Sequence, residues 1–68
     1  MKKYRIVDEQ IAGRYFADGE EFKSKEEVRQ QLISYHSNDI EPSDLKTLED
    51  MTLQEVLEYG SWDIEVIK

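Results

Sequence analysis

Cysteine is absent from this 68-residue chain, which also has only one histidine and one proline. The lack of cysteine excludes disulfides, thiol catalysis and thiolate zinc sites, and it is consistent with a reducing compartment. No apolar run approaches the roughly 20 residues that span a bilayer. Asp8, Glu9 and Gln10 interrupt the segment after the basic N-terminus, where a signal peptide needs an apolar stretch. We therefore expect a cytoplasmic protein with no membrane association.

The small size of the chain limits its core. A chain of this length removes only about 60% of its unfolded surface from water, so residues 1–68 should form a single domain of modest stability. Small domains often gain stability from disulfides, a structural metal or self-association. The composition disfavours the first two, and a homodimer remains an open alternative.

The first quarter of the chain has the composition of a β-hairpin. Residues 4–7 and 14–17 are short, rich in β-branched and aromatic side chains, and separated by a segment that ends in Gly13. The dipeptide Asp18-Gly19 is a turn signal that should end the second strand. Tyr15 and Phe16 alternate in direction, so one of them should face solvent or a partner.

Two capping boxes predict two helices. Ser24 with Glu27 starts an amphipathic helix over residues 25–36, and Thr52 with Glu55 starts a shorter one. Gly60 stands where a left-handed residue commonly ends a helix. Between the helices, residues 40–50 contain Pro42 and polar residues, and they read as a loop with at most one short turn packed on the core.

The end of the chain has the pattern of a strand. Residues 62–66 alternate apolar and acidic side chains, which predicts a half-buried strand with Trp62, Ile64 and Val66 facing inward. Large aromatic side chains should build the core, with one or two of them exposed instead. The predicted fold class is α+β, a β-β-α-α-β domain in which a three-stranded sheet carries two helices on one face.

A family resemblance follows from this layout, and it covers most of the chain except the loop around Pro42. The segments that carry it are Glu21-Phe22-Lys23-Ser24-Lys25-Glu26-Glu27, Tyr35-His36-Ser37, and Thr52-Leu53-Gln54-Glu55-Val56-Leu57-Glu58-Tyr59-Gly60-Ser61-Trp62-Asp63-Ile64-Glu65. In these segments the chain resembles small acidic uncharacterised proteins of bacteriophages and prophages of Gram-positive bacteria. The resemblance implies a phage or mobile-element origin, hence a host cytoplasm, and it implies no functional residues.

The net negative charge of the chain comes from its second half. Residues 1–36 contain seven acids and seven bases, whereas residues 37–68 contain nine acids and two bases, so the net charge of −7 belongs to the second half. A solvated surface that keeps the protein soluble is one explanation. Glu58 lies in the last turn of a predicted helix, where a negative charge opposes the helix dipole. This placement favours a binding role for some of the acids.

We expect the acids of the loop and the second helix to bind a protein with a basic surface. If the last strand pairs with the first, Asp63 and Glu65 should pair with Lys3 and Arg5 and be structural. The partner-binding candidates are Asp39, Glu41, Asp44, Glu49, Asp50, Glu55 and Glu58. Two alternatives remain: an inhibitor that mimics the phosphate row of nucleic acid, and a homodimer with a structural or regulatory role in a phage.

Other chemistries have little support in the sequence. A net charge of −7 opposes direct binding of nucleic acid by the protein. Asp39, Glu41 and Asp44 lack the spacing of a calcium loop, and His36 has no second histidine or cysteine beside it. No catalytic constellation or cofactor motif is present, and a core this small should leave little room for a substrate pocket. We expect a protein that is not an enzyme and needs no cofactor.

Overall fold

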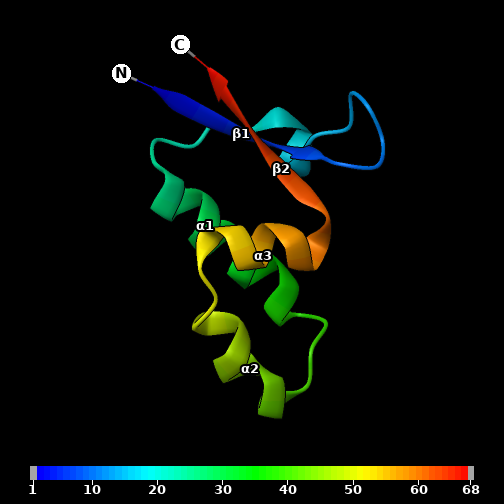
Figure 1. Cartoon of the computed structure of the whole chain (residues 1–68), viewed down its shortest axis with the longest axis vertical. Coiled ribbons are helices and arrows are strands. Elements are labelled where there is room, and N and C mark those ends of the chain that lie inside the picture. Colours follow the sequence, from blue (N-terminus) through cyan, green and yellow to red (C-terminus); the bar gives the residue numbers. More distant parts are fainter. Residues whose placement is uncertain (1, 68) are drawn as a thin grey trace.

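The computed structural model describes residues 2–67, which form an α+β arrangement about 38 Å long, 26 Å wide and 17 Å thick. The elements follow the order β1 (Lys3–Asp8), the 3-10 turn η1 (Phe16–Gly19), α1 (Lys25–Ser37), α2 (Pro42–Glu49), α3 (Leu53–Gly60) and β2 (Trp62–Ile67). The two strands form one end of the molecule, α1 and α3 form the middle, and α2 forms the far end (Figure 1).

The sheet joins the two ends of the described chain. β1 and β2 are antiparallel over their full lengths, with Tyr4 opposite Val66, Arg5 opposite Glu65 and Ile6 opposite Ile64. This confirms the predicted last strand, and it shows that this strand pairs with the first, an arrangement that the sequence left open. Alternation of side chains across the strands directs Ile6 toward the helices, where it is fully buried.

The predicted three-stranded sheet is absent from residues 2–67, because no second strand forms at residues 14–17. Tyr15 and Phe22 each make one isolated bridge to β1. Between them the backbone turns through the left-handed region, with φ of 52° at Ala17, 57° at Asp18 and 87° at Gly19. Three successive left-handed residues cannot continue an extended strand. Tyr15 and Phe16 are both partly buried as a result.

A helix replaces the loop predicted around Pro42. Pro42 occupies the first turn of α2, where its missing N–H leaves no hydrogen bond unmade and its fixed φ suits the helix. Leu48 is buried against the core, whereas Leu45 on the same helix is 37% exposed. The described residues therefore contain three α-helices where the sequence predicted two.

The core lies between the sheet and the helices. It consists of eight buried apolar side chains: Ile6, Phe22, Val28, Leu32, Ile33, Leu48, Val56 and Leu57. Phe22 is the one aromatic residue among them, while Tyr4, Phe16 and Trp62 are partly buried and pack against this core. Tyr35 and Tyr59 are about half exposed, and Val66, predicted to face inward, is 49% exposed.

Candidate functional site

Five of the seven predicted partner-binding acids lie on α2 or beside its ends. We call this group the α2 acids; they are Asp39, Glu41, Asp44, Glu49 and Asp50. All five are exposed. Within residues 2–67 their carboxylates make neither a side-chain hydrogen bond nor a salt bridge. No contact within this part of the protein therefore accounts for the placement of these acids.

The other two acids have local partners. The Glu55 carboxylate accepts a hydrogen bond from the Thr52 backbone N–H at 2.9 Å, and the Thr52 hydroxyl accepts one from the Glu55 N–H at 3.2 Å. This complete capping box satisfies two free N–H groups at the start of α3. The hydrogen bonds from Thr52 lower the pKa of Glu55. Glu58 accepts a hydrogen bond from the Gln54 amide at 3.0 Å.

These contacts separate Glu55 and Glu58 from the α2 acids. Glu55 has the capping role that the sequence predicted, and Glu58, whose placement favoured a binding role, also accepts a hydrogen bond within the helix. A capping interaction contributes about 1 kcal/mol to helix stability. The acids that lack such a role are the five on and around α2.

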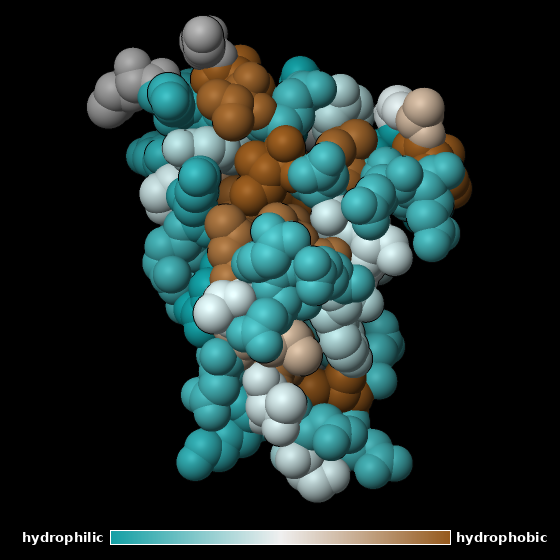
Figure 2. Space-filling view, viewed as in Figure 1, coloured by the Kyte–Doolittle hydropathy of each residue, from teal (hydrophilic) through white to brown (hydrophobic). Residues whose placement is uncertain are grey.

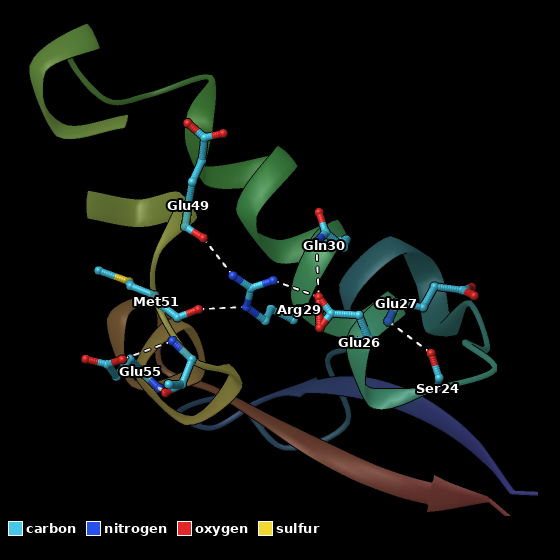
Figure 3. A network of polar contacts seen from close by, with 9 residues as sticks. Ser24, Glu26, Glu27, Arg29, Gln30, Glu49, Met51 and Glu55 are labelled. Carbon is cyan, nitrogen blue, oxygen red and sulfur yellow. Dashed lines mark hydrogen bonds and ion pairs between the residues drawn. The ribbon is translucent and has the colours of Figure 1, made fainter. Parts of the chain in front are cut away.

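Arg29 of α1 holds the end of α2 and the start of α3 in place (Figure 3). Its Nε donates to the Met51 carbonyl at 2.7 Å, and one terminal nitrogen donates to the Glu49 carbonyl at 2.6 Å. The other terminal nitrogen donates to Glu26 at 2.7 Å. Hydrogen bonds from Gln30 and Arg29 lower the pKa of Glu26. A single guanidinium thus joins α1 to the segment between the other two helices.

A second ionic cluster lies on the sheet. Arg5 forms a salt bridge with Glu65, as predicted, and its guanidinium lies 4.8 Å from the centre of the Tyr15 ring. The Tyr15 hydroxyl donates to the second oxygen of Glu65 at 3.1 Å. Asp63 instead lies opposite Val7, and its carboxylate accepts from the Ile64 N–H. The predicted structural role is therefore observed for Glu65, whereas the predicted pairing of Asp63 with a base is not.

Five aromatic rings from η1, α1, α3 and β2 form a connected cluster, and no local sequence pattern predicts their arrangement. Phe16 packs edge-to-face on Tyr35 and Trp62, with ring centres 5.2 and 5.5 Å apart. His36 packs edge-to-face on Tyr35 and Tyr59. The Trp62 indole N–H donates to His36 Nε2 at 3.2 Å, which requires His36 to be neutral with its other nitrogen protonated.

The Trp62–His36 hydrogen bond predicts a pH-dependent stability. Burial lowers the pKa of His36 below 6.5, and the nearby charge of Asp39 opposes this shift in part. The unfolded chain therefore binds a proton at a higher pH than the folded chain, and the free energy of unfolding falls as the pH drops through 6.5. Urea unfolding at pH 7.5, 6.5 and 5.5 measures this loss.

The matched variant is His36→Gln, which keeps a hydrogen-bond acceptor within reach of Trp62 but does not titrate between these pH values. The exposed carboxylates affect both proteins in the same way, so the difference between them isolates His36. Equal pH dependence in the two proteins would exclude a role for His36.

Two of the open hollows on the surface are large, although little pocket volume was expected. One, of about 540 Å³, is lined by residues of the turn before and within η1, including Arg14 and Asp18. The other, of about 480 Å³, lies between α3 and β2. In residues 2–67 no group of three or more histidine, aspartate or glutamate side chains is arranged to hold a metal ion. No helix in this part of the chain has the length and apolar character needed to cross a membrane.

Comparison with known proteins adds no relative. No protein-family model, curated protein or solved structure matches the chain.

Proposed function

We propose that this chain is a small acidic interaction module of phage or prophage origin, which binds a basic surface on a host or phage protein through the α2 acids. The observation that carries the proposal is the contrast among the acids. Those on the sheet and on α3 have hydrogen-bond partners within the protein, whereas the α2 acids have none among residues 2–67. Charges left unpaired on one element are available to a partner.

The position of α2 supports the same role. The helix lies at the end of the long axis opposite the sheet (Figure 1), so a partner can approach it without meeting β1 or β2. Leu45, 37% exposed, lies among the α2 acids and offers a small apolar contact. Apolar contact surrounded by charge is a common arrangement in transient interfaces, where the charges speed association and select the partner.

The test compares two variants of equal net charge. In the first, the α2 acids are neutralised as Asp39→Asn, Glu41→Gln, Asp44→Asn, Glu49→Gln and Asp50→Asn. In the second, the same number of exposed or half-exposed acids in the first half are neutralised, as Glu9→Gln, Asp18→Asn, Glu20→Gln, Glu21→Gln and Glu27→Gln. Each of the two variants therefore has a net charge of −2, compared with −7 for the wild type.

We expect the immobilised wild-type chain to retain a basic protein from a lysate of a Gram-positive bacterium, and moderate salt to release it, because exposed charges are screened within about 8 Å at physiological ionic strength. The first variant should lose the captured protein and the second should retain it. Equal loss in both variants would show that total charge alone is responsible, and equal retention would exclude the α2 acids. Release of the captured protein by duplex DNA would favour nucleic-acid mimicry over a general basic partner.

A further inference from the structure

Among the residues that the structure describes, one side of the β2 backbone has no strand partner. Tyr4 of β1 exchanges two backbone hydrogen bonds with Phe22, at 2.8 and 2.7 Å, on the side of β1 away from β2. Successive residues of an antiparallel strand direct their N–H and C=O groups to opposite sides. Tyr4 and Val66 therefore form a pair without mutual hydrogen bonds, and Ile64 and Val66 direct their N–H and C=O groups away from β1.

Within residues 2–67, no strand or loop backbone bonds to this outer side of β2. The single contact there is local, because Asp63 Oδ1 accepts from the Ile64 N–H at 2.8 Å. The Ile64 C=O and both backbone groups of Val66 remain available. An open row of backbone donors and acceptors is the surface to which an extended chain adds as a further strand.

A groove with apolar and polar walls lies against β2. It is the hollow of about 480 Å³, lined by Leu53 and Leu57 of α3 and by Ile64 and Val66 of β2, with Lys25, Thr52, Gln54 and Asp63 around them. Figure 2 shows apolar surface over β2 and the adjoining part of α3, bordered by hydrophilic residues. The groove can therefore hold the apolar side chains of an added strand while the edge of β2 bonds to its backbone.

We propose that an extended segment of another protein, with alternating apolar and basic side chains, adds to the open edge of β2. Side chains alternate in direction along a strand, so apolar residues at every second position enter the groove between α3 and β2. The residues between them face outward. The backbone of the segment bonds to Val66 and to the Ile64 carbonyl. This site is separate from the α2 acids, and either surface can bind without the other.

Charge favours a basic segment over a second copy of this chain. Two copies paired through β2 would place the Asp63 and Glu65 carboxylates of both on neighbouring strands, and each copy has a net charge of −7. Like charges on paired strands are destabilising. Asp63 has no salt-bridge partner within the described residues. Lysine or arginine at the outward positions of the added strand would balance this charge.

The test starts from a selection with random peptides displayed against the immobilised full chain. We expect the enriched sequences to alternate apolar residues with lysine or arginine. A synthetic peptide of an enriched sequence is then added to the isotope-labelled protein and followed by NMR. The expected result is a set of shifts in β2 and α3, together with slower hydrogen exchange of the Val66 amide.

Val66→Pro removes the N–H that faces the open edge and leaves the hydrogen bonds between β1 and β2 in place. It should weaken peptide binding about tenfold, the effect of losing one intermolecular hydrogen bond and its alignment. Val66→Thr keeps the N–H and a β-branched side chain, and should bind within about threefold of the wild type. The variant with neutral α2 acids should retain binding, which separates this site from the proposed function.

Four results would overturn the proposal: no enriched sequence, enriched sequences without basic residues, shifts confined to α2, or equal binding by Val66→Pro and wild type. Slower exchange at Val66 that depends on protein concentration, without peptide, would identify a second copy as the occupant and would equally contradict a basic segment.

Discussion

Gly60→Ala should destabilise the protein by about 1–3 kcal/mol, although alanine is the better helix former. Gly60 is the last residue of α3, and a Cβ placed there would lie 2.4 Å from Trp62 Nε1 and 2.5 Å from His36 Nε2. These two atoms are the donor and acceptor of the same hydrogen bond. Neighbouring rings pack against both partners, so neither can move away freely. Urea unfolding at pH 7.5, followed by Trp62 fluorescence, gives the free-energy change.

A double variant distinguishes a steric effect from a general helix effect. His36→Ala removes one of the two rings that the new Cβ would meet, so adding Gly60→Ala to His36→Ala should have a smaller effect than adding it to wild type. In an open environment, glycine to alanine within a helix stabilises by roughly 0.5–1 kcal/mol. An increase in the stability of the single variant would therefore show that no close contact exists at Gly60.

The same residue shows what the sequence could and could not predict. Gly60 at the end of α3 was expected to adopt the left-handed conformation, but Ser61 does so, with φ of 56°. Glycine is required at position 60 because two side chains approach it closely. One of them, His36, is 24 positions away in the sequence. Local patterns predict helix ends, whereas contacts of this kind depend on how α1 and β2 meet in the folded chain.

The elements with strong local patterns were predicted well. The capping residues Ser24 and Thr52 begin α1 and α3, and the alternation after Trp62 gives β2. Two predictions failed because the residue type on which each depended is common in two different local structures. Pro42 marks a loop or the first turn of a helix, and here it begins α2. Aromatic residues favour strands or clusters, and Phe16 joins an aromatic cluster, while Ala17 and Asp18 turn the chain.

Only the structure distinguishes the surface acids that have a structural role from those that do not. The excess of acids in the second half of the chain is evident from the sequence, but their partners are not. Glu55 could be read as part of a capping box or as a binding residue, and its hydrogen bonds to Thr52 show the first role. The open edge of β2 had no sequence signal, because a two-stranded and a three-stranded sheet share the same local patterns.

Arg29→Met should produce the second large loss of stability, about 2–4 kcal/mol, since hydrogen bonds from a charged group contribute about 1.5–3 kcal/mol each. Methionine preserves much of the apolar stem, but it leaves the carbonyls of Glu49 and Met51 without the donors that now reach them. The Arg29 side chain is only 20% exposed, so water replaces these bonds incompletely. Denaturant unfolding gives the change in stability, and hydrogen exchange of α2 amides should become faster.

Two control variants separate the contacts of Arg29. Glu26→Gln keeps a hydrogen-bond acceptor and removes one exposed charge, so its stability should stay close to that of the wild type. Arg29→Lys keeps the charge, but its ammonium cannot match the planar fork that reaches both carbonyls, so the loss should be intermediate. If Arg29→Lys were as stable as wild type, the fork would be unnecessary. If Glu26→Gln accounted for the full loss, the ion pair, and not the two carbonyl contacts, would hold α2 against α1.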